Sequence, residues 1–337
     1  MLPVSVIIPA RNEASNLERL IQSLWAQSLP PAEILVVDAG SEDDTAQVAY
    51  RLGCRVVQVD RAYPGQARNV GVAYARQEIV AFWDASMWVA PQGLERLVTP
   101  ILEGRADLVQ GRLALRPLSY VSRLSFWTIS TLYHVREGKA IYYLPPVACT
   151  AFRKVLWEAV GGFPSWRARE DSEFRQRLQA LPIRIYYEPQ SLTYWEPAET
   201  WTSIGRKLRL YGRHNLLSGK PWSWYRRLVQ LYGAYLGVAL AIGYTIGWAE
   251  GVGAFWASTA LGGIGRCLRK ALTYRQIIKS NFSLDPLELR HFISGIALIL
   301  YGDWASFLGV WDWLIGDKLR LAPETFPEPQ VRAVLEP

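Results

Sequence analysis

The fold is decided by V-S-V-I-I-P-A-R-N-E at residues 4–13 and by I-L-V-V-D-A-G-S-E-D-D-T at residues 34–45. Each stretch opens with a continuous apolar, β-branched run, which is typical of a strand buried on both faces. Each run closes on a polar turn. Between them, apolar residues recur at helical spacing, at Leu17, Leu20, Ile21, Leu24 and Trp25. The pattern predicts two parallel strands joined by a right-handed helical crossover.

The two polar turns belong to the same edge of the predicted sheet. Ligands of open α/β sheets bind outside the carboxyl ends of the strands. We therefore expect Asn12, Glu13, Asp38 and Ser41 to lie side by side in a nucleotide pocket. No G-x-G-x-x-G turn is present in this block, which argues against a dinucleotide fold.

Strand and helix signals alternate as far as about residue 195, which predicts an α/β domain with a mostly parallel sheet. Strands are expected near 4–9, 33–38, 55–59, 78–83, 107–114, 147–152 and 183–188. Helices are expected near 14–27, 42–52, 65–75, 91–103 and 170–180. The aromatic-rich segment 117–146 is interpreted as a helix and loop over the site.

The character of the chain changes after residue 200. The 337-residue chain has a formal charge of +7, and seven basic residues without an acidic one lie between Ser203 and Arg227. Nucleic acid or an anionic membrane surface suits such a cluster, and the apolar sequence that follows favours the membrane over nucleic acid. We expect 1–200 to be the α/β domain that carries the pocket and 201–227 to be a basic juxtamembrane helix.

A hydrophobic helical region is expected at 228–316. Residues 228–249 carry no charge, and neither do the 15 residues between Glu250 and Arg266. A span needs about 20 apolar residues, so 228–265 is interpreted as a transmembrane hairpin with both ends cytoplasmic. A third apolar segment, 292–315, contains Asp303 and Asp312 and either packs on the hairpin or lies in the interface. The alternative is a buried helical subdomain. A polar tail is expected at 317–337.

The cysteines and the N-terminal residues indicate where in the cell the protein is located. Cys54, Cys149 and Cys267 have neither metal-site nor disulfide spacing, so buried reduced thiols are expected. The first predicted strand starts almost at Met1, with no signal peptide before it. We expect a protein of the cell membrane whose N-terminal domain, residues 1–200, faces the cytoplasm.

Five motifs occur in the order seen in family 2 glycosyltransferases. Besides the two opening stretches they are G-Q-A-R-N-V-G-V-A-Y-A at 65–75, I-V-A-F-W-D-A-S at 79–86, and V-A-C-T-A-F-R-K-V-L-W-E-A-V-G-G-F-P at 147–164 with R-E-D-S-E-F at 169–174. Over residues 3–195 the chain thus resembles these enzymes. The resemblance implies the GT-A fold and inversion of configuration at the transferred sugar.

For the donor pocket, the resemblance implies that Pro9, Arg11, Asn12, Glu13 and Asp38 line the base and ribose of a UDP- or GDP-sugar. Helix capping by Asn12 and turn formation by Asp38 are the structural alternatives. Many relatives have a second aspartate where this chain has Ala39.

Arg68 follows Pro64-Gly65 at the start of a predicted helix. A guanidinium and free backbone N–H groups there suit a diphosphate. The alternative is a surface arginine. Asn69 and Gly71 are expected to serve close helix packing.

Asp84 follows a predicted strand and stands at the D-x-D position of the resembling family. Its carboxylate is expected to reach Mg²⁺ or Mn²⁺ bridging the donor diphosphate. Ser86 replaces the second aspartate and is expected to be at most a weak metal ligand.

Glu170 and Asp171 open a predicted helix. An acidic pair there also complements the helix dipole. The resemblance gives Asp171 the role of general base toward the acceptor hydroxyl, and Glu170 that of orienting it or the acceptor.

These inferences predict a membrane-attached inverting glycosyltransferase that uses a lipid or lipid-linked acceptor. Residues 201–215 either hold the phosphate of that acceptor or form a juxtamembrane helix that contacts lipid head groups. His134, Arg136, Arg206 and His214 are weaker candidates for that acceptor site. Two alternatives remain: a non-catalytic membrane protein that keeps the fold, and a transferase acting on a soluble acceptor.

Overall fold

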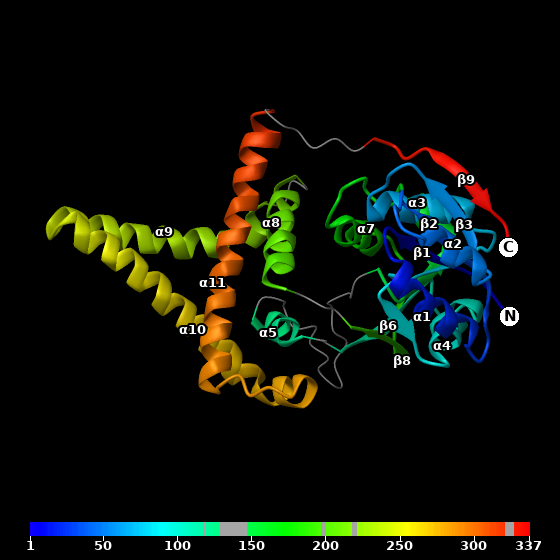
Figure 1. Cartoon of the computed structure of the whole chain (residues 1–337), viewed down its shortest axis with the longest axis horizontal. Coiled ribbons are helices and arrows are strands. Elements are labelled where there is room, and N and C mark those ends of the chain that lie inside the picture. Colours follow the sequence, from blue (N-terminus) through cyan, green and yellow to red (C-terminus); the bar gives the residue numbers. More distant parts are fainter. Residues whose placement is uncertain (117–118, 129–146, 197–199, 218–220, 321–326) are drawn as a thin grey trace. The chain divides into compact units, whose positions relative to one another are not determined.

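The computed structural model describes the chain except residues 117–118, 129–146, 197–199, 218–220 and 321–326 (Figure 1). The chain divides into two compact units. The first comprises the described parts of Met1–Arg116, His134–Pro197 and Thr325–Pro337. The second comprises those of Pro117–Tyr133 and Ala198–Glu324. The predicted boundary near residue 200 thus lies close to the point, between Pro197 and Ala198, where the chain passes from the first unit to the second.

A nine-stranded sheet forms the centre of the first unit, in the order β5-β8-β6-β7-β4-β1-β2-β3-β9. The strands are β1 (Leu2–Ala10), β2 (Pro31–Asp38), β3 (Arg55–Val59), β4 (Ile79–Phe82), β5 (Met87–Val89), β6 (Leu108–Leu115), β7 (Thr150–Arg153), β8 (Ile185–Trp195) and β9 (Val331–Leu335). The four central strands β3, β2, β1 and β4 are mutually parallel. Beyond them β7, β5 and β9 run antiparallel to their neighbours, so the α/β sheet is more mixed than the alternation predicts.

The helices of this unit are α1 (Ala14–Trp25), α2 (Thr45–Arg51), α3 (Pro64–Tyr74), α4 (Gly93–Leu102), α6 (Lys154–Ala159) and α7 (Glu170–Gln179). Five of them match predicted helices. The short α6 and strands β5 and β9 were not predicted. Four residues of the predicted apolar face of α1 are fully buried, namely Leu17, Leu20, Ile21 and Leu24, whereas Trp25 is partly buried.

The strand β1 continues one residue past Pro9, where the sequence predicts that it stops. Pro9 pairs in register with Val37 of β2. On its other side the ladder with β4 already ends at Ile7 and Phe82, so the missing N–H of Pro9 interrupts no pairing with β4.

Helix α3 lies very close to the sheet, as predicted from Asn69 and Gly71. A Cβ at Gly71 would stand 2.3 Å from Cγ2 of Ile7, so a side chain there has no room. Asn69 accepts hydrogen bonds from Nε1 of Trp157 and the backbone N–H of Phe163, and donates to the Phe163 carbonyl. Both residues are structural.

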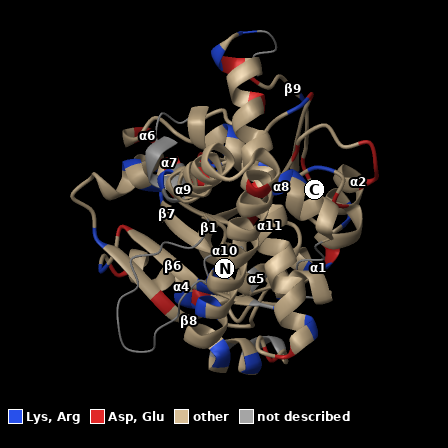
Figure 2. Cartoon of the chain, turned by 90° about the vertical axis from the view of Figure 1, so that its left-hand side faces the viewer, with Lys and Arg blue, Asp and Glu red and all other residues tan. Residues whose placement is uncertain are grey.

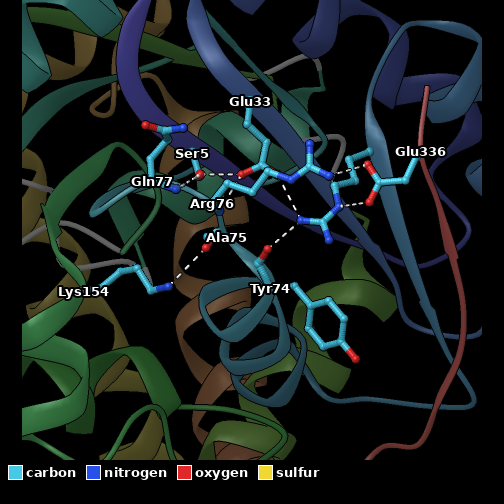
Figure 3. Close-up of polar contacts among 9 residues, drawn as sticks. Ser5, Glu33, Tyr74, Ala75, Arg76, Gln77, Lys154 and Glu336 are labelled. Carbon is cyan, nitrogen blue, oxygen red and sulfur yellow. Dashed lines mark hydrogen bonds and ion pairs between the residues drawn. The ribbon is translucent and has the colours of Figure 1, made fainter.

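The segment predicted as a polar tail contains a strand of the sheet. β9 pairs antiparallel with the outer strand β3, from Val56 opposite Leu335 to Val59 opposite Val331. Glu336 accepts from Arg55 at 2.7 Å and from Arg76 at 2.9 Å. Figure 3 shows these contacts beside Glu33, which also accepts from Arg55. A covered β3 offers no free edge to another chain.

The second unit is helical, with α5 (Tyr120–Thr128), α8 (Trp201–Leu217), α9 (Pro221–Thr245), α10 (Trp248–Phe282), α11 (Leu289–Asp312) and the π-helix η1 (Trp313–Lys318). Within it α9 and the first half of α10 run side by side away from α11 (Figure 1). In the described part of the chain, two helical segments are long and apolar enough to cross a membrane, Leu228–Thr245 and Leu289–Lys318.

Candidate functional site

The turns after β1 and β2 meet, as the sequence predicts. Asn12 adopts a left-handed conformation with φ of 55°. Its backbone N–H donates to Oγ of Ser41 at 3.0 Å, and its Oδ1 accepts from the N–H of Glu42 at 2.8 Å. Glu13 donates its N–H to Oγ1 of Thr45. Ser41 therefore joins the two loops and does not cap α2, which begins only at Thr45.

The side chain of Asp38 is buried and closes the second turn. Its Oδ1 accepts from the N–H of Ser41 at 3.0 Å, and its Oδ2 from Nε2 of Gln58 at 3.3 Å. This is the turn-forming arrangement that the sequence leaves as an alternative. Arg11 is exposed at the loop, and Pro9 is half-buried.

A buried arginine joins two sequence-predicted residues from other elements. Arg68, near the start of α3, is only 6 % exposed. Its Nη1 donates to Oε1 of Glu170 at 2.8 Å, and its Nη2 to Oδ1 of Asp84 at 2.9 Å. The guanidinium was expected to face a diphosphate. In the structure both its Nη atoms already bind carboxylates.

Burial and charge act in opposite directions on this ion triad. Burial lowers the pKa of Arg68, but Asp84, Glu170 and Asp171 more than offset it, so the pKa is raised and the arginine stays charged. Burial, together with the nearby charge of Asp171, raises the pKa of Glu170 to about 7 against the opposing effect of Arg68.

Asp171 is the partly exposed member of the acidic pair. It follows Glu170 in the first turn of α7, after Arg169 in a left-handed conformation with φ of 66°. Its Oδ1 accepts from the N–H of Ser172 at 2.6 Å. The turn therefore directs Glu170 inward to Arg68 and leaves Asp171 at the surface of the site.

Glu13 brings the first loop into the same cluster. Burial raises its pKa, a hydrogen bond from Asn16 lowers it, and the charges of Asp84 and Asp43 raise it again. Asp43 was not among the residues predicted from the sequence. It accepts from the N–H groups of Ala14 and Thr45, and its position before a helix start in D-D-T is the available signal.

Asp84 and Ser86 are the two residues that the sequence predicts as metal ligands. The side chain of Asp84 is 40 % exposed despite its bond to Arg68. Oγ of Ser86 accepts from Nε1 of Trp195 at 3.1 Å. Within the described part of the chain no three His, Cys, Asp or Glu side chains are grouped closely enough to hold an ion.

Other predicted features lie outside this cluster. Cys54, Cys149 and Cys267 are buried and free, as expected. A small apolar pocket between α7, β6 and β7 is lined by none of the predicted site residues. His134 and Arg136 lie outside the described residues. In α8 Arg206 is exposed and His214 buried.

The raised pKa of Glu170 predicts a pH-dependent stability. The folded value of about 7 exceeds the ordinary 4.5, so protonated Glu170 stabilises the fold below pH 4.5 and this contribution is lost as pH rises to 7. Glu170→Gln should flatten the fall in unfolding free energy over that window by on the order of 2 kcal/mol. Denaturant unfolding at several pH values measures it, with Glu173→Gln on the same helix as control. An unchanged pH profile would contradict the assignment.

Comparisons with known proteins bear on the family and on the fold. Residues 5–158 match the family model described as Glycosyl transferase family 2. They form a family 2 glycosyltransferase domain. Among structures, the mannosyltransferase PcManGT from Pyrobaculum calidifontis, solved with GDP-Man and Mn²⁺, is similar in fold. Its TM-score is 0.55 at 19 % identity, over 92 % of this chain and 87 % of that chain. The predicted GT-A fold is thereby confirmed.

Two of the curated relatives carry glycosyltransferase names. Glycosyltransferase AglE of Haloferax volcanii is 34 % identical over 48 % of this chain. An uncharacterized glycosyltransferase of Mycobacterium bovis is 34 % identical over 43 % of it. The chain spans 56 % and 65 % of the length of these two relatives. The succinoglycan biosynthesis protein ExoA of Rhizobium meliloti is 29 % identical over 94 % of this chain and 96 % of its own length.

Proposed function

We propose that the protein is an inverting glycosyltransferase that moves a sugar from a UDP- or GDP-sugar to a lipid or lipid-linked acceptor at a membrane. The observation that carries the proposal is the joining of Arg68, Asp84 and Glu170 at one edge of a family 2 domain, with Asp171 beside them. Segments distant in sequence supply acidic and basic groups to one place, which a purely structural sheet edge does not need.

Asp171 is the proposed general base. The acceptor hydroxyl oxygen attacks the anomeric carbon and passes its proton to the Asp171 carboxylate, while the bond from that carbon to the diphosphate breaks and its electron pair leaves with the nucleoside diphosphate. Attack opposite the leaving group inverts the configuration. The partial exposure of Asp171 suits contact with an acceptor, whereas buried Glu170 is already held by Arg68.

Asp84 is the proposed protein ligand of a divalent cation, Mg²⁺ or Mn²⁺. Its carboxylate is partly exposed and lies near the acidic Glu13, which suits a hard cation. Diphosphate oxygens and water would have to supply most of the other ligands, and Ser86 would add at most its hydroxyl, which already accepts from Trp195. When bound, the cation offsets the charge that develops on the leaving diphosphate.

Arg68 positions this machinery. By binding Asp84 and Glu170 at once, it fixes the end of β4 relative to the start of α7. Its positive charge also lies beside the place proposed for the diphosphate. Asn12, Glu13 and Asp38, together with Pro9 and Arg11, shape the loops proposed to receive the base and ribose.

The proposal predicts donor-dependent chemistry that is easily measured. Purified protein in detergent, given UDP- and GDP-sugars with Mn²⁺ and a membrane lipid extract, should release the nucleoside diphosphate from one donor class and lose this activity with EDTA. Release stimulated by soluble sugars but not by the lipid extract would replace the lipid acceptor with a soluble one. If no donor gives nucleoside diphosphate release and no nucleotide binds, the protein is a non-catalytic membrane protein instead.

Two variants test the metal site within the same assay. Asp84→Asn should raise the Mn²⁺ concentration for half-maximal release by about 10- to 100-fold, because it removes the proposed charged ligand. Ser86→Ala should raise it much less, since the hydroxyl is neutral and already bonded to Trp195. Equal effects of the two substitutions would contradict the assignment.

A further inference from the structure

The second unit contains two segments that can cross a membrane by length, and their surroundings differ. Only 11 % of the apolar 18-residue window Leu228–Thr245 in α9 is buried, against 44 % of the apolar 18-residue window within Leu289–Lys318 of α11 and η1. We propose that only the hairpin of α9 and the first half of α10 enters the bilayer, and that α11 lies along the membrane surface with α8. The inference rests on the membrane attachment in the proposed function.

The outer surface of the hairpin is apolar and open. Large apolar side chains there are about half exposed or more: Leu236, Val238, Leu240, Tyr244, Trp248, Val252, Trp256 and Leu261. Figure 2 looks onto the free end of the hairpin, where uncharged ribbon predominates. Its 18-residue apolar window at 1.5 Å per residue is about 27 Å long, close to the ~30 Å of a bilayer core.

The two hairpin helices contact each other through glycines. A Cβ at Gly251 would stand 2.6 Å from the carbonyl oxygen of Ala239 and 2.9 Å from Cα of Gly243. A Cβ at Gly262 would overlap the hydroxyl of Tyr235. Close backbone approach over small residues is typical of helix pairs in lipid, where no hydrophobic force drives helices together.

A polar cluster marks the base of the hairpin. Asp303 of α11 accepts from Nη1 and Nη2 of Arg266 at 3.1 and 2.6 Å, and from the hydroxyl of Tyr232 at 2.9 Å. Arg266 ends the uncharged stretch of α10, and exposed charges such as Arg269 follow it. The middle of α11 therefore lies level with the point where the apolar part of the hairpin ends.

The ion pairs of α11 with α8 argue against a spanning position. Arg209 binds both oxygens of Asp312, and Arg213 binds both oxygens of Asp317 in η1. A Cβ at Gly309 would overlap the carbonyl oxygen of Arg209, so the two helices are in backbone contact. If α11 crossed the bilayer, it would carry the arginines of α8 into hydrocarbon, at about 2.5–3.5 kcal/mol each.

The free face of α11 fits the membrane surface. Leu289, Ile293, Trp304 and Trp311 are 56–72 % exposed and fall on one side of the helix at 3.6 residues per turn. The residues buried by its neighbours, among them Leu298 and Gly309, lie on the opposite side. In Figure 1 the hairpin leaves α11 on the side away from α8. An apolar, tryptophan-bearing stripe on the hairpin side suits the headgroup–acyl boundary.

Cysteine accessibility in vesicles tests this topology. Wild type supplies the background, since its three cysteines are buried. Leu289→Cys, Lys318→Cys and Glu250→Cys, each at an exposed position, are reconstituted separately into vesicles of phosphatidylcholine and phosphatidylglycerol, with the catalytic unit outside as checked by protease. We expect an impermeant maleimide to label the Leu289→Cys and Lys318→Cys variants from outside, and the Glu250→Cys variant only after the vesicles are permeabilised.

The outcomes separate this inference from the function on which it rests. Labelling of the Leu289→Cys and Lys318→Cys variants from opposite sides would overturn the surface position of α11 while leaving membrane attachment intact. Failure of all variants and of wild type to float with vesicles would overturn both. Nucleoside diphosphate release, assayed on the same preparations, reports the transferase activity independently of either result.

Discussion

Replacement of Asp171 by asparagine should lower the rate of sugar transfer by about 10²- to 10⁴-fold, the usual contribution of a general base. The amide cannot take the proton of the acceptor hydroxyl, while its size and its acceptance of the Ser172 N–H are retained. Stability and donor binding should therefore change little. Single-turnover transfer and nucleotide titration measure the two effects separately.

The matched control for this variant is Glu173→Gln. Glu173 lies in the same turn of α7 and makes an ion pair with Arg177, so its replacement removes an equal charge from the same helix. It should leave transfer within about threefold of wild type. Full activity of Asp171→Asn, or an equal loss in both variants, would remove Asp171 from the role of base.

Replacement of Arg68 by methionine should lower the free energy of unfolding by about 3–5 kcal/mol, because it leaves buried Glu170 without its partner. The loss should be larger at pH 8 than at pH 5, since removal of the arginine raises the pKa of Glu170 further and protonation then relieves the unpaired charge. Denaturant unfolding at both pH values measures it.

A double-mutant cycle tests whether the effect runs through the ion pair. In an Arg68→Met, Glu170→Gln protein the unpaired charge is gone, so we expect part of the lost stability to return and the pH dependence to disappear. Strictly additive losses would show that Arg68 acts through packing alone. Transfer activity should stay low in the double variant, because Asp84 remains without its bond to Arg68.

The sequence predicts the sheet edge and the residues on it, because both depend on local patterns. Buried strand runs, polar turns and the order of motifs predict Glu13, Asp84 and Asp171 at one edge of the sheet. The engagement of Arg68 was not predictable in this way. It depends on the turn at Arg169, which directs Glu170 inward over a separation of 102 residues.

In the helical unit, too, local features are predictable from the sequence and features that depend on distant contacts are not. Apolar runs predict α9 and the start of α10 well, since a long uncharged helix needs little context. Whether α11 spans a membrane is not decided by its own composition. It depends on the arginines of α8, about 100 residues earlier, that bind Asp312 and Asp317.

The pairing of β9 with β3 affects the order in which the parts of the protein can fold during synthesis. β9 follows the whole helical unit in the chain, yet it belongs to the sheet of the first unit. The ribosome adds about 5–20 residues per second, so on the order of ten seconds separate the end of β8 from the emergence of β9. During that interval β3 exposes an unpaired edge, and Arg55 lacks Glu336. Insertion of the hairpin would therefore precede completion of the catalytic sheet.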